Sequence, residues 1–322
     1  MTACALRLTG AIVLSLLTAS ACAFDLEGHR GTRGLAPENT MAAFRRALAI
    51  GVMTIETDLA VTRDDVLVIS HDPFLNPDVV RDENGQWLAQ KGPPIRRLTL
   101  AEIKRYDIGR LNPASRYAAQ FPEQQSADGE RFPALRELFD FVKGSDKPVR
   151  LNIETKITPL DAGQTVDPAT FARLIVEAVQ ANGMADRVTV QSFDWRTLIE
   201  IKKRAPQIAT ACLTIETENS DNVKPVGDGP SPWTAGLDLR RYEGSLPRLV
   251  QAAGCMIWSP LARNVTAARI AETHALGMTV LPWTVNEPVE MRRLIDAGVD
   301  GIITDYPDRL RRVMSEKQLA LP

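Results

Sequence analysis

The sequence is poor in the residues that hold soft metals or build disulfide frameworks. Only four of its 322 residues are cysteine and three are histidine, and the absence of any CxxC pair excludes a zinc ribbon or a thioredoxin-like redox motif. Cys4 and Cys22 lie in the N-terminal segment, which leaves Cys212 and Cys255 for the folded part. Both fall in apolar runs typical of core strands, and we interpret them as buried free thiols. A disulfide between them stays open if the compartment is oxidising.

An excess of charge of one sign is also missing. The 38 lysine and arginine residues nearly balance 40 aspartate and glutamate residues, for a formal net charge of −2. Without a global basic field, we expect no nucleic-acid partner, and any phosphate must be recognised locally. Hydrophobic residues make up 44% of the chain, which is enough for a sizeable core.

The only long apolar run lies near the N-terminus. Residues 8–17 are mainly apolar, follow Arg7, and lead into small residues that end at Ala23. This pattern is typical of a secretory signal peptide cleaved after Ala23, and the run is too short to span a membrane. We therefore expect a secreted or periplasmic protein with one domain, residues 24–322, and no transmembrane segment. A loose lipobox ending at Cys22 leaves a lipid-anchored protein as the alternative.

Short β-like runs alternate with amphipathic helical segments along the rest of the chain. This alternation indicates βαβ units with a parallel sheet, and eight units in succession favour a closed (β/α)₈ TIM barrel. An open doubly wound sheet is the main alternative, but no GxGxxG loop follows the first strand. We expect strands at residues 25–29, 54–59, 149–154, 188–193, 208–213, 256–259, 279–283 and 301–304. We expect helices at residues 40–50, 134–142, 168–182, 195–205, 246–253, 264–276, 288–297 and 308–314.

One β-like run does not fit the eight units. Residues 66–71 are separated from the second expected strand only by residues 62–65, whereas a parallel crossover needs a dozen residues or more. We therefore expect residues 54–71 to form a long hairpin whose return strand lies outside the barrel. Two long segments, an insertion at about 72–132 and a loop at about 214–244, leave from carboxyl ends of strands, where barrel enzymes build their sites.

Carboxylates gather at the expected carboxyl ends of two strands. Glu56 and Asp58 are two residues apart on one strand, so their side chains point the same way, and Glu154 ends the next barrel strand. Three hard oxygen ligands at one rim favour Ca²⁺ or Mg²⁺. Ordinary ion pairs between these carboxylates and Arg30 or Lys156 explain the same spacing equally well. Unpaired burial of these charges would be costly.

Two of the three histidines are expected at the same rim. His29 ends the first strand beside Arg30, and His71 ends the return strand of the hairpin. His274 lies in an expected helix with no charged cluster near it, and we assign it no role.

The segment PENT, residues 37–40, indicates the start of a helix. Asn39 or Thr40 would cap that helix, and Glu38 could hydrogen-bond a histidine of the site.

Taken in order, these elements resemble the glycerophosphodiester phosphodiesterase family over about residues 25–312. One departure is Thr155, where the family usually has an aliphatic residue. The matching motifs are His29–Gly31, Pro37–Thr40, Glu56–Asp58, His71–Asp72, Asn152–Lys156, Trp283–Asn286 and Asp300–Pro307.

The resemblance implies a TIM barrel that uses a divalent cation to hydrolyse glycerophosphodiesters, the deacylated phospholipid headgroups. The products are an alcohol and sn-glycerol 3-phosphate. It implies general acid/base catalysis by His29 and His71, which leaves open which is the acid and whether water or the glycerol 2-hydroxyl attacks. The implied metal ligands are Glu56, Asp58 and Glu154. The implied substrate-binding residues are Arg30, Lys156, Gln191 and Trp283.

Two other functions stay open. A phospholipase D-like action on intact lipids would be favoured by an apolar rim on the segments 72–132 and 214–244, which are mostly polar. A non-catalytic sugar- or phosphate-binding barrel is the third reading, and the two histidines argue against it.

Overall fold

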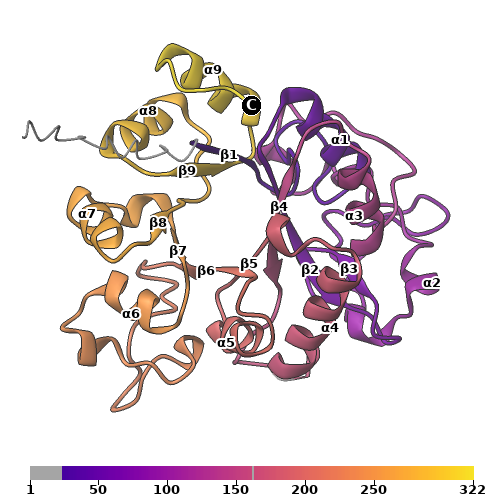
Figure 1. Ribbon diagram of the computed structural model, residues 1–322. Helices are drawn as coiled ribbons and strands as arrows, with labels where there is room; N and C mark the ends of the chain where they lie inside the picture. The colour runs from indigo at the N-terminus through magenta and orange to yellow at the C-terminus, as the bar shows by residue number, and fades with distance from the viewer. Residues whose placement is uncertain (1–23, 162) are drawn as a thin grey trace, which may run out of the picture.

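Eight parallel strands form a ring with helices on its outside (Figure 1). In the computed structural model, residues 24–161 and 163–322 are described, so the expected signal peptide and its lipobox alternative lie outside the described residues. The ring order is β8-β7-β6-β5-β4-β2-β1-β9. Its strands are β1 (Asp25–Gly28), β2 (Thr54–Val61), β4 (Arg150–Thr155), β5 (Val188–Ser192), β6 (Ala209–Thr214), β7 (Ile257–Pro260), β8 (Thr279–Val280) and β9 (Gly301–Thr304).

Amphipathic helices cover the outside of the ring, and none of the described helices is long and apolar enough to cross a membrane. The helices are α1 (Met41–Ile50), α3 (Leu135–Lys143), α4 (Pro168–Ala181), α5 (Trp195–Arg204), α6 (Leu246–Ala252), α7 (Ala267–Ala275), α8 (Pro288–Ala297) and α9 (Pro307–Glu316). Short 3₁₀ turns lie at Ile95–Arg97, Ala118–Gln120, Ala185–Arg187, Pro232–Thr234, Leu239–Tyr242 and Ala262–Asn264.

Backbone hydrogen bonds between the last two strands close the ring. Ile303 N donates to Pro282 O at 3.0 Å, and Val285 N donates to Ile303 O at 3.0 Å. The expected strand at 279–283 is regular only over Thr279–Val280, because Pro282 has no N–H to give to a ladder. The predicted (β/α)₈ barrel is confirmed.

Helix α1 shows how local sequence fixes the loop before it. Thr40, one of the two expected caps, accepts a hydrogen bond from Ala43 N at 3.1 Å. Gly51 ends the helix with a φ of +88°, which glycine adopts without a steric penalty. Phe44 and Ala47 are buried against the barrel. Helix α1 is therefore capped at both ends, and its N-terminal cap fixes the end of the segment that follows β1.

The hairpin that the short spacing predicts is present. Strand β3 (Leu67–Ile69) pairs antiparallel with the outer half of β2, with Leu59 opposite Ile69. It stands outside the ring order, and on its other side Val68 forms an isolated antiparallel bridge with Ala134.

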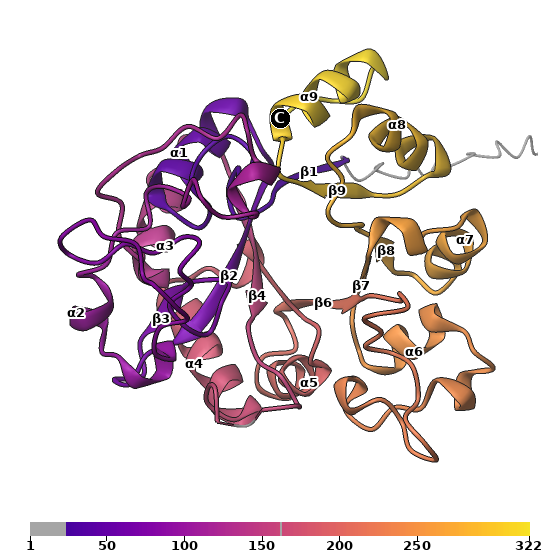
Figure 2. The ribbon, with the colours of Figure 1, turned by 180° about the vertical axis from the view of Figure 1, so that it is seen from behind.

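The insertion after β3 has a small core of its own on one flank of the ring (Figure 1 and Figure 2). Its α-helix, α2 (Leu100–Ile103), is a single short turn that begins with a capping box of Thr99 and Glu102. The buried members of this second core are Ala60, Val68, Leu75, Val80, Ile95, Ile103, Ile108 and Phe132.

Cys212 and Cys255 form a disulfide, so the prediction of free thiols is wrong. Cys212 lies in β6, and Cys255 lies just before the adjacent strand β7. The parallel pairing of these strands brings the two Cα atoms to 5.8 Å across a separation of 43 residues. Spacing in the sequence does not reveal that proximity.

Candidate active site

A cavity of about 230 Å³ opens at the carboxyl ends of the strands. Of the nine residues that the sequence puts forward, Asp58 alone does not line this cavity; it is fully buried behind it. The nine residues therefore gather in one place, although they come from six different strands and loops. The cavity is lined by His29, Arg30, Arg33, Glu56, His71, Glu154, Lys156, Gln191, Phe193, Leu213, Trp283, Thr284 and Ile303.

Three carboxylates form the acidic cluster at the base of the cavity. Strand pairing sets Asp58 of β2 opposite Glu154 of β4, with Glu56 two residues earlier on β2. One carboxylate oxygen from each lies within 4.8 Å of the others, and all three residues are buried. The cluster could hold a metal ion.

The charges of the acidic cluster are only partly balanced by the described residues. Lys156 Nζ donates to Glu154 Oε1 at 2.7 Å, and Arg30 Nε lies 3.3 Å from Asp58 Oδ2. The ion pairs of the alternative reading therefore do form. Even so, burial and the neighbouring Asp58 raise the pKa of Glu56 well above its usual value, and burial raises the pKa of Glu154 to about 7.

Asp58 stays the most acidic member. Burial alone would raise the pKa of Asp58, but the charge of Arg30, together with that of Lys156, outweighs it and lowers that pKa. Its Oδ2 accepts a hydrogen bond from Asn39 Nδ2 at 2.9 Å, whereas its buried Oδ1 accepts none from the described residues. An unsatisfied carboxylate oxygen among raised-pKa carboxylates fits a hard divalent cation.

The first loop reverses direction to place His29 and Arg30 side by side. Arg30 has a φ of +49° and Gly31 a φ of +82°, a left-handed region that arginine seldom adopts. Arg30 N donates to Glu56 Oε2 at 2.8 Å, which holds the turn against the acidic cluster. A Cβ atom on Gly31 would lie 2.8 Å from the Ala43 Cβ, so only glycine fits there.

His29 is fixed through one ring nitrogen. Nδ1 lies 2.7 Å from Asp305 Oδ1, and Nε2 lies 3.8 Å from Glu56 Oε2. A carboxylate partner makes Nδ1 the protonated nitrogen and leaves Nε2 free to accept a proton. Burial, with the nearby charge of Arg33, lowers the pKa of His29 to about 4, so the imidazole is neutral at pH 7.

His71 approaches the cavity from the hairpin side. Its Nδ1 lies 3.2 Å from Asp72 Oδ1, and Asn76 Nδ2 donates to Asp72 Oδ2 at 2.6 Å. Burial and the charge of Arg30 lower the pKa of His71. Its side chain is 32% exposed, against 12% for His29, so solvent and substrate reach His71 more easily.

Residues 29–309 match the glycerophosphoryl diester phosphodiesterase family. The chain belongs to this family. A glycerophosphodiester phosphodiesterase of Caldanaerobacter subterraneus is 31% identical over 286 residues, covering 88% of this chain and 94% of that protein. The crystal structure of a Silicibacter pomeroyi protein, assigned as a glycerophosphoryl diester phosphodiesterase, superposes with a TM-score of 0.82 at 34% identity, covering 93% and 95% of the two chains. An Oleispira antarctica phosphodiesterase, solved with its product sn-glycerol-3-phosphate, shares the fold at a TM-score of 0.65 and 21% identity, covering 90% and 96%.

Membership confirms the resemblance drawn from the motifs and makes the chain a phosphoric diester hydrolase. Gln191, on β5, hydrogen-bonds to Glu56 of the acidic cluster. Its Nε2 donates to Glu56 Oε1 at 2.8 Å, and its Oε1 accepts from Asn152 Nδ2 at 3.1 Å. Trp283 stands at the wall, with its ring edge-on to Phe193 at 5.3 Å.

Glu38 does not contact a histidine as the sequence suggested. Its Oε1 accepts from Arg30 Nη1 at 2.6 Å, and its Oε2 accepts from the Tyr117 hydroxyl. The segment PENT therefore hydrogen-bonds to the guanidinium of Arg30 through Glu38 and to Asp58 through Asn39.

Sequence reasoning missed Arg33 and Tyr117 and gave no role to Asp305. Arg33 donates from Nε and Nη2 to the two oxygens of Asp305, at 2.8 and 3.0 Å, and from Nη1 to the Tyr117 hydroxyl at 3.2 Å. Asn286 Nδ2 also donates to Asp305 Oδ2, at 2.7 Å. The family motif at residues 300–307 contains Asp305 and could have identified it as a site residue. No motif in the insertion marks Tyr117.

His274 lies outside the cavity, on α7. Its Nε2 lies 2.8 Å from Asp300 Oδ2, a single carboxylate just before β9. Asp300 precedes β9, whereas Asp305, which contacts His29, follows it. The pair of His274 and Asp300 therefore lies at the opposite end of the barrel from the cavity.

Proposed function

We propose that the chain hydrolyses glycerophosphodiesters to an alcohol and sn-glycerol 3-phosphate, with His29 and His71 transferring protons. One observation carries the proposal: two histidines, three cationic side chains and the acidic cluster open into a single cavity of about 230 Å³. That set matches what a phosphodiester needs, namely charge neutralisation on its oxygens and proton transfer on either side of phosphorus.

Substrate binding falls to Arg30 and Lys156. Arg30 uses Nη1 for Glu38, its buried Nε lies 3.3 Å from Asp58 Oδ2 without a hydrogen bond, and no described side chain accepts a hydrogen bond from its Nη2. That end is available for a non-bridging phosphate oxygen, in a charge-assisted bond. Lys156 adds a second positive charge beside Glu154. Gln191 and Trp283 complete the wall against which the glycerol part would rest.

A divalent cation, Ca²⁺ or Mg²⁺, would be held by Glu56, Asp58 and Glu154. When bound, it would stabilise the negative charge that builds on the phosphate oxygens. The chain's own residues prepare the site: Gln191 fixes one oxygen of Glu56, and Asn39 fixes one oxygen of Asp58. The unsatisfied Asp58 Oδ1 supports this assignment.

Proton transfer falls to the two histidines. Asp305 fixes the ring of His29 so that Nε2 can take a proton, and Asp72 does the same for His71. Both pKa values are lowered by burial, which supports neutral imidazoles at the start of the reaction. The less exposed His29 and the more exposed His71 would serve opposite sides of phosphorus.

The test is turnover of glycerophosphocholine by the purified protein, with choline and sn-glycerol 3-phosphate measured separately. Release of both, abolished by a chelator and restored by Ca²⁺ or Mg²⁺, supports the proposal. Binding without turnover would instead indicate a non-catalytic barrel. Turnover of diacyl lipids alone would indicate the phospholipase D-like alternative.

We also propose that residues 24–322 are the mature, exported domain. The apolar run before Ala23 and the disulfide between Cys212 and Cys255 support this. Intact-mass spectrometry of the protein from the host's periplasm or medium tests it. A mature chain that begins at a lipid-modified Cys22 would contradict cleavage after Ala23.

A further inference from the structure

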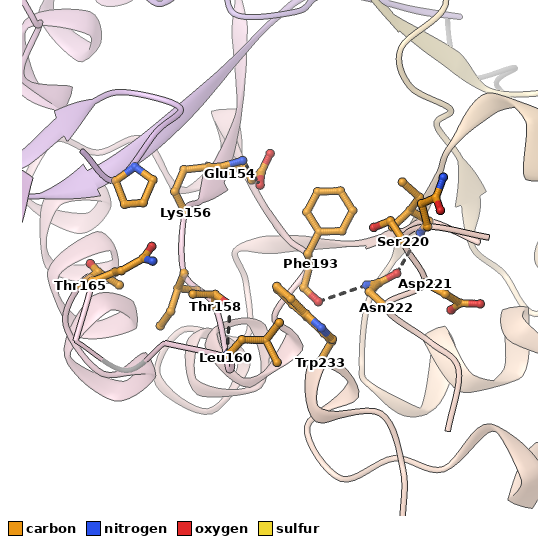
Figure 3. Close-up of a pocket in the computed structure, with 15 residues that line it drawn as sticks. Glu154, Lys156, Thr158, Leu160, Thr165, Phe193, Ser220, Asp221, Asn222 and Trp233 are labelled. Carbon is orange, nitrogen blue, oxygen red and sulfur yellow. Dashed lines mark hydrogen bonds and ion pairs between the residues drawn. The ribbon is translucent and has the colours of Figure 1, made fainter. Parts of the chain in front are cut away.

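A second and larger cleft, of about 530 Å³, adjoins the candidate active site. The two cavities share Glu154, Lys156 and Phe193 in their walls. A substrate with its phosphate beside Lys156 can therefore extend past the ring of Phe193 into this cleft. Figure 3 shows that ring between Lys156 on one side and Trp233 on the other. Nothing in the reaction of a small glycerophosphodiester requires so much additional space.

The wall of the cleft is anchored by a buried side chain. Asn222 Nδ2 donates to Phe193 O at 3.3 Å and to Leu213 O at 3.0 Å, and its Oδ1 accepts from Ile215 N at 2.9 Å. One asparagine thus ties the long loop after β6 to the ends of β5 and β6.

Trp233 is fixed through the same anchor. Ser231 Oγ donates to Asn222 O at 2.7 Å and accepts from Trp233 N at 3.3 Å. Both Asn222 and Ser231 are buried. The backbone that carries the indole is therefore held in place, and binding would not have to order this part of the loop.

The exposed surface of the wall is mainly apolar. Ile157, Leu160, Phe193, Ile215 and Trp233 line it, and the Leu160 side chain is 72% exposed at its mouth. Figure 3 shows Leu160, Phe193 and Trp233 close together. An aliphatic chain laid between them would remove this surface from water, at a gain proportional to the area covered.

Charged side chains are few in the cleft, namely Glu154, Lys156 and Asp221. Glu154 and Lys156 pair with each other at the end nearest the active site. Asp221, on the far side, uses Oδ1 to accept from Val223 N at 3.0 Å and from Lys224 N at 2.8 Å. Among the described lining residues, Lys156 is the only basic one, which leaves no second basic group for an anionic substituent. A cage for a cationic headgroup is built from aromatic faces, whereas here aliphatic side chains stand beside the two rings and favour a hydrocarbon chain.

We propose that this cleft binds a hydrocarbon chain carried by the phosphodiester substrate. The inference rests on the proposed function, because the phosphate must first sit beside Lys156. The chain could be on the leaving alcohol or on the glycerol, and the chemistry of the cleft is the same for both.

The experiment compares kcat/KM of the cation-loaded protein across two substrate series. One series is the methyl, butyl and octyl esters of sn-glycerol 3-phosphate, and the other is glycerophosphocholine and its 1-hexanoyl and 1-octanoyl esters, all below their critical micelle concentrations. Each methylene that becomes fully buried raises kcat/KM up to about fourfold, so the octyl or octanoyl ester should exceed the shortest member of its series at least tenfold. A rise in the first series assigns the chain to the alcohol, and a rise in the second assigns it to the glycerol.

Leu160→Ser is the matched variant. It should cut kcat/KM for the long ester several-fold and leave the methyl ester unchanged, with no loss of fold because the side chain is exposed. Val226→Ser is the control, since Val226 is 65% exposed but does not line the cleft. It should change neither.

Three outcomes overturn the inference. Both series are flat, or Leu160→Ser slows the methyl and long esters equally, or glycerophosphocholine outpaces every alkyl and acyl ester. In these cases short glycerophosphodiesters are still hydrolysed and the proposed function stands. Hydrolysis of none of the substrates would overturn the proposed function and the inference with it.

Discussion

Asp305→Asn isolates the contribution of the carboxylate that fixes His29. All four side-chain contacts of Asp305 are with donors: Oδ1 faces His29 Nδ1 and Arg33 Nε, and Oδ2 faces Arg33 Nη2 and Asn286 Nδ2. An asparagine offers one acceptor oxygen, so its NH₂ group must oppose two of these donors in either orientation. Asn286 cannot turn its amide to compensate without losing the bond that its Oδ1 accepts from Asp305 N at 3.0 Å.

The magnitude follows from those lost contacts. Hydrogen bonds to a charged group contribute about 1.5–3 kcal/mol each, and removing the counter-charge of a buried guanidinium costs about 3–5 kcal/mol. The two estimates describe overlapping contacts, so we expect the free energy of unfolding to fall by about 3–5 kcal/mol. His29 also loses its orientation and its protonated Nδ1, so kcat should fall by about 10²–10⁴, the usual contribution of a positioned acid or base.

The assay is glycerophosphocholine turnover at a temperature where circular dichroism shows the variant to be folded, with urea unfolding measured in parallel. Asp300→Asn is the matched control, because Asp300 contacts His274 at 2.8 Å in a pair outside the cavity. It should leave kcat within about twofold, well under the ~1.4 kcal/mol of a tenfold change. A folded Asp305→Asn protein with normal kcat would refute the reasoning that Asp305 orients a reacting imidazole.

The other predictions concern the remaining site residues and the disulfide. His29→Ala and His71→Ala should each lower kcat by about 10²–10⁴, while His274→Ala leaves the rate unchanged; near-normal turnover by His71→Ala would contradict the mechanism. His71→Ala should change stability little, whereas His29→Ala also removes one hydrogen bond to the buried Asp305 and should lower the free energy of unfolding by about 1.5–3 kcal/mol. A nitrophenyl ester, which needs no general acid, should rescue only the variant that lost the acid. Glu154→Gln should weaken Ca²⁺ or Mg²⁺ binding in a calorimetric titration without changing the fold, and a metal-free protein with full activity would exclude the metal assignment. Cys255→Ser opens a cross-link spanning 43 residues and should lower the free energy of unfolding by about 2–4 kcal/mol in urea; an unchanged urea midpoint would mean that the cross-link does not stabilise the fold.

Most of the barrel and the acidic cluster could be predicted because both depend on regular periods. The period of two along a strand places Glu56 and Asp58 on one side, and parallel pairing brings Glu154 beside them. The short spacing before residue 66 was enough to reveal the hairpin.

The parts that could not be predicted depend on contacts between distant irregular segments. Tyr117 reaches Arg33 and Arg30 from a long insertion in which no periodicity marks the direction of a side chain. The disulfide depends on the register of β6 and β7, which spacing alone does not give. The apolar cleft is similar, since Leu160, Phe193 and Trp233 follow three different strands, and spacing does not show that their side chains line one cleft.

The second core has a consequence for heat inactivation. His29 leaves a strand of the ring, whereas His71 follows β3, whose Val68 packs into the small core of the insertion. Leu67 and Ile69 of β3 pack into the main core, so His71 lies where the two cores meet, and the smaller core, with fewer buried apolar residues, is the one expected to open first. Partial unfolding of the insertion would withdraw one imidazole while the barrel, the acidic cluster and the other imidazole persist. Activity would then be lost at a lower temperature than the bulk of the helical signal, and cooling would restore it without refolding of the ring.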